Sequence, residues 1–293
     1  MSPPPLFDTA LRRLRLARAA RNGLADDVLL PRVAEELAER LSYVLRDFPL
    51  AVDIHSRGPE IAQTIGTLPR VGRVLRAGEG PDNDVVFDGE ALPFAENSLD
   101  LAISALALQW IEDVPGTLVQ IRRALKPDGL LLAAIAGGDT LIELREAFAL
   151  AESETIGGVT PRVIPFGALN DFGGLLQRAG FALPVADSER ITVRYSDLYG
   201  LFRDLRALGA TNPMLARSRT PLRRETLARL DAIYREKFAD PDGKLRVTVE
   251  IIWLSGWVPH ESQQKPLRPG SAKARLADAL GTVEIPSGVK PGG

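Results

Sequence analysis

The sequence contains no cysteine and only two histidines, His55 and His260, among its 293 residues. The absence of cysteine excludes disulfides, zinc–thiolate sites, iron–sulfur ligation and thiol catalysis. It fits a cytoplasmic protein that uses no disulfides. An iron site built from two histidines and one carboxylate would need both imidazoles. They lie far apart in the sequence and neither has a second ligand at helical spacing, so we expect no metal site.

Long apolar runs and a strong net charge are also absent. No run approaches the length of a transmembrane helix, so we expect no membrane span. The net charge of −2 gives no indication of nucleic acid or an anionic membrane as a partner. The first five residues show no basic region followed by an apolar core, so no secretory signal is expected.

The N-terminal segment is rich in arginine, with Arg12, Arg13, Arg15, Arg18 and Arg21. This pattern is found both in organelle transit peptides and in solvated helix faces. On pattern alone we favour the solvated helix face.

Short apolar strands alternate with helices from Leu50 onward, which predicts an α/β fold with a doubly wound, mostly parallel sheet. Lys126–Gly129 is predicted as a turn, and Thr140 with Glu143 as a capping box that opens the next helix. The predicted strands are 50–54, 72–75, 84–87, 100–104, 130–135, 186–195 and 245–257. The predicted helices lie within 6–46 and over 61–65, 115–125, 140–151, 169–179, 197–208 and 221–238.

The organisation predicted from these elements is one domain over residues 1–258, with N-terminal helices over 1–48, followed by a Pro/Gly-rich tail over 259–293. The stretch His260–Ser271 is polar and rich in proline. Two interpretations of it stay open, a segment that folds over a pocket or binds a partner and a solvated C-terminal extension.

The turn after the first predicted strand is short of glycine. In nucleotide-binding α/β domains, glycines at this turn let the backbone approach the ligand and adopt positive φ. Here the turn reads His55-Ser56-Arg57-Gly58-Pro59, with Gly58 alone remaining. Either the pocket is altered, with Arg57 gripping an anion, or the turn is filled and holds no ligand.

Two further clusters follow later strands. Asp88-Gly89 comes after the third strand, where a carboxylate can accept a hydrogen bond from an adenine amino group, although an ordinary acidic turn is the alternative. Trp110 follows the fourth strand, where α/β sheets bind ligands. It would stack on a ligand or, as we favour, pack under the next helix. No catalytic base can be named.

These clusters, in this order, resemble the class I S-adenosylmethionine (SAM)-dependent methyltransferases. The likeness is greatest to the branch that contains the biotin-pathway malonyl-carrier methyltransferase and the mitochondrial complex I assembly factor described as an arginine hydroxylase. It covers nearly everything between Leu6 and Leu280. The segments that carry it are Asp88–Phe94, Asn97–Ser104, Leu106–Trp110, Gln120–Leu130 and Gly137–Leu141.

The resemblance implies a Rossmann-like class I methyltransferase fold with seven strands, the last one antiparallel, and a helical insertion over 196–240 that covers the pocket. It also implies SAM as the cofactor, at the carboxyl edge of the first four strands. Asp53 matches the acid that ends the first strand, Asp88 the acid on the adenine side, and Ser104 and Leu106 the wall after the fourth strand. The residues expected to contact the cofactor are Asp53, His55, Gly58, Asp88, Gly89, Ser104 and Leu106.

The chain departs from the family pattern at two of the usual cofactor contacts. The family turn runs D-x-G-x-G-x-G, and its three glycine positions hold His55, Arg57 and Pro59 here. The acid expected after the second strand is also missing, because Arg76 occupies its place and Glu79 is the nearest carboxylate. Together these changes suggest weakened or lost SAM binding, or an altered ligand.

The function expected from this resemblance is that of a SAM-dependent methyltransferase-like protein of the complex I assembly branch. It would act on a protein or carrier-linked substrate recognised by Leu198–Arg219, with a respiratory complex I subunit as a possible partner. The alternative is a catalytically silent scaffold or assembly chaperone that has lost the cofactor. Hydroxylation, as described for the assembly factor, rests on the resemblance alone.

Overall fold

A computed structural model describes residues 4–22, 29–264 and 281–282 of the chain. The chain divides into two units, Met1–Pro259 and His260–Gly293. Most of the tail predicted over 259–293 lies outside the described residues. The fold is therefore that of the first unit.

A seven-stranded sheet forms the centre of this unit, with strand order β3-β2-β1-β4-β5-β7-β6. Strands β1 to β5 run parallel, whereas β7 is antiparallel to both of its neighbours. This arrangement confirms the predicted class I methyltransferase sheet with an antiparallel last strand. The strands are β1 (Phe48–Ile54), β2 (Val71–Gly78), β3 (Val85–Val86), β4 (Leu99–Ala105), β5 (Leu125–Ala136), β6 (Ala182–Tyr195) and β7 (Leu245–Trp257).

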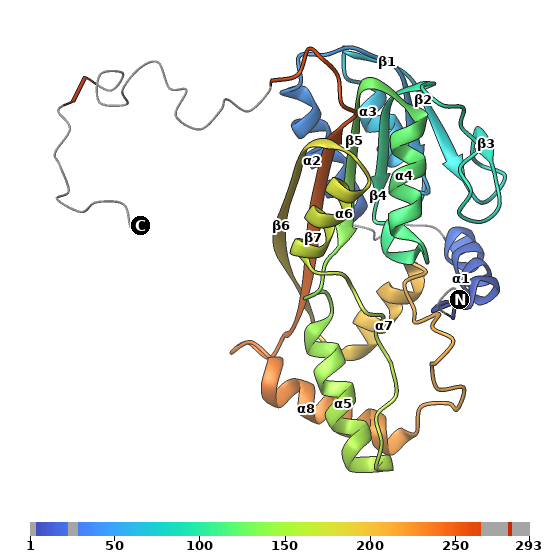
Figure 1. Cartoon of the computed structure of the whole chain (residues 1–293). Coiled ribbons are helices and arrows are strands. Elements are labelled where there is room, and N and C mark those ends of the chain that lie inside the picture. The colour runs from blue at the N-terminus through green and yellow to red at the C-terminus, as the bar shows by residue number, and fades with distance from the viewer. Residues whose placement is uncertain (1–3, 23–28, 265–280, 283–293) are drawn as a thin grey trace, which may run out of the picture. The chain divides into compact units, whose positions relative to one another are not determined.

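Helices cover both faces of the sheet (Figure 1). Their bounds are α1 (Thr9–Asn22), α2 (Leu29–Ser42), α3 (Glu60–Gly66), α4 (Val114–Ala124), α5 (Ile142–Ile156), α6 (Leu169–Arg178), α7 (Leu198–Ala207) and α8 (Arg224–Phe238), with a short 3₁₀ turn η1 (Leu108–Trp110). α2 and α3 pack on one face in one apolar cluster, and α4 and α6 pack on the other face in a second cluster. Because both faces are covered, β1, β4 and β5 are almost entirely apolar, as buried parallel strands are.

The elements α5, α7 and α8 form a third apolar cluster with the start of β7. The N-terminal segment joins the chain beyond α7, because Phe7 bridges to Met214 and the Asp8 amide donates to the Pro213 carbonyl over 2.8 Å. The Asp8 carboxylate also pairs with Arg217 over 2.9 Å. α1 is thereby fastened at its start to the segment that follows α7.

Two local predictions are wrong. The Lys126–Gly129 turn is part of β5, because Gly129 and Asp128 exchange backbone hydrogen bonds with Val258 and extend the ladder there. Its turn residues instead produce an irregular register between β4 and β5 and a positive φ of 62° at Asp128.

The capping box predicted from Thr140 and Glu143 at the start of α5 does not form, because both side chains form hydrogen bonds with β7 instead. The Thr140 hydroxyl bonds with the backbone of Glu250 over 3.1 Å. The Glu143 carboxylate accepts from the Thr248 amide over 3.0 Å. Leu141, with a φ of 57°, occupies the N-cap position instead.

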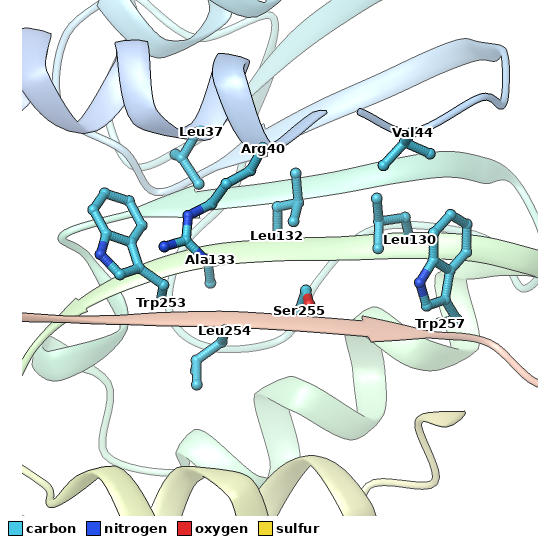
Figure 2. A pocket seen from close by; sticks show the side chains of 10 residues that line it. All are labelled: Leu37, Arg40, Val44, Leu130, Leu132, Ala133, Trp253, Leu254, Ser255 and Trp257. Atoms are coloured by element: carbon cyan, nitrogen blue, oxygen red, sulfur yellow. The ribbon is translucent and has the colours of Figure 1, made fainter. Parts of the chain in front are cut away.

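Arg40 connects α2 to the outer strands of the sheet. Its guanidinium donates two hydrogen bonds to Asp187 on β6, over 2.7 and 2.8 Å, and one to Glu36 over 2.7 Å. It also lies 4.8 Å from the centre of the Trp253 ring on β7. Figure 2 shows this guanidinium between α2 and the strands, beside a small apolar cavity that ends at Trp257. Bidentate pairing and stacking on an aromatic ring are properties of arginine that lysine does not reproduce.

We expect Arg40→Ala to lower the free energy of unfolding by about 1–2 kcal/mol, because it removes a bidentate ion pair and a cation–π contact. Urea denaturation measures the change. Arg70→Ala is the matched control, since its single ion pair to Asp47 is exposed and such pairs contribute about 0–1 kcal/mol. Equal losses in the two variants would contradict the role of Arg40.

Candidate functional site

A cavity of about 1290 Å³ opens at the carboxyl ends of β1, β2 and β4. Its wall comprises the turn after β1, the end of β2, the segment after β4, one side of α1 and residues from α7 to Leu222. This is larger than the roughly 300–1,000 Å³ of most small-molecule sites. It lies at the sheet edge where open α/β folds bind ligands.

The turn after β1 keeps a glycine-like backbone although glycine is replaced. His55 has a φ of 61°, a left-handed conformation that non-glycine residues seldom adopt. Its amide donates to the Ala77 carbonyl over 2.7 Å, which holds the turn on β2. Its imidazole packs on Phe87, with ring centres 4.9 Å apart, and lies over Gly78. Burial, and secondarily the charge of Arg12, lowers the pKa of His55 to about 4, so this imidazole is neutral at physiological pH.

Gly58 has a φ of 74°, and the Glu60 carboxylate lies where its Cβ would be. Both features explain why this position is glycine, although the three glycine positions of the family turn hold other residues. Pro59 follows as the N-cap of α3 and makes no side-chain cap. Gly58, His55 and Ser56 all line the cavity.

Two serine hydroxyls connect this turn to β4. The Ser104 hydroxyl, fully buried, donates to the Ile54 carbonyl over 3.0 Å. The Ser56 hydroxyl accepts from the Ala105 amide over 2.8 Å. Leu106 comes next with a φ of 51° and lines the cavity, whereas Ser104 is not among the described residues that line it. Gln109 also lines the cavity; its amide nitrogen donates to the Leu106 carbonyl over 2.7 Å, while its buried side-chain oxygen accepts from no described group.

Asp53 ends β1 with a side chain that is 2% exposed. Neither carboxylate oxygen has a hydrogen-bond partner among the described residues. Burial raises the pKa of Asp53 to about 7, although the nearby Ser56 hydroxyl and the charge of Arg76 oppose the rise. Arg76 is the register partner of Asp53 on β2. Ionising this buried carboxylate therefore costs free energy in the folded protein. Asp53 is not among the described residues that line the cavity.

The two carboxylates that the resemblance brings closest to an adenosyl group form ion pairs with Arg13 of α1. Arg13 pairs with Glu79 over 2.9 Å and also with Asp88, whose side chain is 81% exposed. Neither Asp88 nor Gly89 is among the described residues that line the cavity. The position of the missing ribose acid is held by Arg76, which donates to the Asp82 carbonyl over 2.8 Å. The residues present therefore fit an adenosyl group poorly at its ribose and adenine ends.

The arginines of α1 were interpreted from the sequence as a solvated helix face, which holds for the exposed Arg13, Arg18 and Arg21, whereas Arg12 and Arg15 are only partly exposed. Four of them, Arg12, Arg13, Arg15 and Arg21, line the cavity. Arg12 and Trp110 contact each other across it, with the guanidinium 5.9 Å from the ring centre. The sequence signal was available in the spacing of Arg12 and Arg15, three residues apart on one side of a helix, but nothing in the sequence revealed what that side faced.

Within the described residues, no group of three or more His, Asp or Glu side chains is arranged to hold a metal ion. In the same part of the chain, no helix is long and apolar enough to cross a membrane.

Comparisons with known proteins place these features in context. A family model for the methyltransferase domain matches residues 52–133. The human mitochondrial arginine-hydroxylase NDUFAF5 is 38% identical over 97% of this chain and 86% of its own length. The malonyl-[acyl-carrier protein] O-methyltransferase of Xylella fastidiosa is 35% identical over 87% of this chain and 89% of its own.

Solved structures agree on the fold. BH2331 of Bacillus halodurans, described as a candidate methyltransferase, superposes with a TM-score of 0.53 at 16% identity. It is matched over 99% of its length and 78% of this chain. The YcgJ protein of Bacillus subtilis gives a TM-score of 0.51 at 14% identity, over 99% of its length and 77% of this chain. At such identities the likeness concerns the fold alone.

We expect Asp53→Asn to stabilise the protein at about pH 8, by at most roughly 4 kcal/mol, because the raised pKa means that ionising the buried carboxylate costs free energy. From about pH 4 to 7, Asp53 keeps its proton in the native state and loses it in the unfolded chain, so this group lowers the stability of the wild type as the pH rises. The lowered pKa of His55 acts in the opposite direction, but equally in both proteins. The free energy of unfolding of the variant should therefore rise relative to that of the wild type through that window. Urea denaturation at both ends of the window measures the difference.

Asp100→Asn is the matched control for this experiment. Asp100 is also buried, but its carboxylate pairs with Lys126 over 2.9 Å and accepts from the Leu50 amide over 3.0 Å. Its replacement should therefore destabilise the protein at the higher pH. A loss of stability in Asp53→Asn as large as in Asp100→Asn would show that Asp53 has a partner that stabilises its charge.

Proposed function

The chain belongs to the family of class I methyltransferase-fold proteins that includes NDUFAF5 and malonyl-[acyl-carrier protein] O-methyltransferase, and from this membership we propose that it is a methyltransferase-like assembly protein with a weakened SAM site. It acts in the cytoplasm in the assembly of respiratory complex I, on a protein or carrier-linked substrate. The complex I context comes from the sequence resemblance, and the carrier-linked substrate from the name of the Xylella relative.

One observation carries this proposal: the cavity at the sheet edge is kept while the glycine positions of its cofactor turn hold His55, Arg57 and Pro59. The retained cavity supports a ligand-binding role. The buried imidazole beside Gly78, where a glycine would leave room, supports a loss of SAM affinity. Residues 196–240, the proposed insertion, supply part of the cavity wall through Phe202, Arg206 and Leu222, and we assign substrate recognition to this region.

A catalytically silent assembly scaffold is the second candidate. It is favoured by the ion pairs of Arg13, which occupy both Glu79 and Asp88, the two carboxylates nearest to the adenosyl positions. A protein that had lost the cofactor entirely could keep such pairs permanently. We do not propose hydroxylation, because no residue of this chain supports it beyond the name of the mitochondrial relatives.

Calorimetric titration with SAM distinguishes the two candidates. For the wild type we expect a Kd of about 0.1–1 mM, which is a weaker binding free energy than the roughly −8 kcal/mol of a micromolar Kd. The variant His55→Gly/Arg57→Gly/Pro59→Gly restores the family turn, and His55→Gly suits the positive φ of that residue. It should bind SAM at least about tenfold more tightly, a gain of about 1.4 kcal/mol.

His260→Gly is the control, because it removes the other imidazole at a position outside the cavity wall; SAM affinity should not change. Micromolar binding by the wild type would contradict a weakened site. Absence of binding in both the wild type and the restored variant would favour the silent scaffold.

A further inference from the structure

The wall of the cavity is strongly positive, although the chain as a whole carries a net charge of −2. Among the described residues, nine arginines line it against two carboxylates, Glu79 and Asp82. Three of these arginines are matched by carboxylates, since Arg13 pairs with Glu79 and Asp88, Arg162 with Glu152, and Arg217 with Asp8. Among the described residues, the wall therefore carries more positive than negative side chains.

Four arginines of the wall, Arg12, Arg15, Arg76 and Arg206, form no ion pair with any described carboxylate. The charge of Arg12 on α1 acts on His55 at the end of β1, and the charge of Arg76 on β2 acts on Asp53. The Nε atom of Arg76 is buried and donates to no described group. Arginine guanidinium groups match the geometry of phosphate and carboxylate oxygens through paired N–H donors.

One turn further along α1, Arg15 lies near a second cation of the wall, Arg217. The Arg15 guanidinium donates to the Thr211 carbonyl over 3.1 Å and also to that of Asn212. Burial, and then the neighbouring charge of Arg217, lowers the pKa of Arg15. Only Asp8, already paired with Arg217, compensates for these two charges. Because these neighbouring cations share one carboxylate, their charge would stabilise an additional anion bound near them.

SAM is the wrong ligand for such a wall, because its sulfonium and ammonium groups outnumber its single carboxylate. An aromatic and apolar part of the wall lies beside the arginines, formed by Trp110, Phe166 and Phe202 among others. From the arginines and this apolar surface together, we propose that the cavity binds an anionic ligand that carries a phosphate or diphosphate group attached to a less polar part. The inference rests on the proposed function only in that SAM binding is weak.

The test is calorimetric titration of the whole chain at about 50 mM salt, where exposed charges are little screened. The probes are inorganic pyrophosphate, ADP, phosphopantetheine and SAM. We expect at least one phosphate-bearing probe to bind at least about tenfold more tightly than SAM, and its binding to weaken as salt is added. Comparison of the first three probes identifies the source of the phosphate, namely a free anion, a nucleotide or a carrier arm.

The variants Arg12→Gln and Arg15→Gln each remove one cation that α1 contributes to the cavity wall. Each should weaken binding of the phosphate-bearing probe about tenfold or more, because charge-assisted hydrogen bonds are lost. Arg178→Gln is the matched control; this exposed residue of α6 does not belong to the wall, and its variant should bind like the wild type. Melting curves without ligand show whether each variant is folded, and the probe should raise the melting temperature of the wild type.

Absence of binding by all three phosphate-bearing probes would overturn the inference, as would unchanged affinity in both cavity variants. Neither result bears on the SAM titration of the glycine-restored turn. Failure of the proposed function, seen as micromolar SAM binding by the wild type, is therefore distinguishable from failure of the anionic site.

Discussion

Coverage of both faces of the parallel sheet by helices is the constraint on which the rest of this structure depends. α2 and α3 on one face and α4 and α6 on the other bury the central strands β1, β4 and β5. A ligand then reaches the sheet at its carboxyl edge, where the strands end. There the ends of β1 and β2 and the segment after β4 bring His55, Arg76 and Gln109 to one cavity.

At that edge, the backbone adopts left-handed conformations although the residues there are not glycine. His55 and Leu106 end neighbouring strands with φ values of 61° and 51°. Such conformations cost of the order of 1 kcal/mol or more each and persist only where the surroundings impose them. Here the hydrogen bonds from His55 to Ala77 and from Leu106 to Ala134 impose them. The sheet thus dictates the shape of the turn, while the side chains of the turn and of α1 line a cavity rich in arginine.

The fold was predictable because its signals are local and redundant. The apolar runs of β4 and β5 and the helical spacing in α2 indicate their burial without knowledge of the neighbours. Predictions that depended on a distant partner were less secure. Thr140 and Glu143 have the spacing of a capping box, yet they bond to β7 more than a hundred residues later.

The cavity was predictable only in part, for the same reason. Its place at the sheet edge and the residues His55, Gly58 and Leu106 followed from the resemblance. The contribution of Arg12 and Arg15 did not, because it depends on α1 being fastened to the segment around Pro213, an interaction between residues about two hundred positions apart.

That attachment of α1 has a consequence for how the protein can be handled and processed. One helix of 14 residues supplies four of the nine arginines in the wall. A chain that began after α1 would therefore keep both apolar clusters that cover the sheet, because α1 belongs to neither, and would lack nearly half of the arginines around the cavity. A short segment at the start of the gene thus sets much of the charge of a cavity whose scaffold is encoded later.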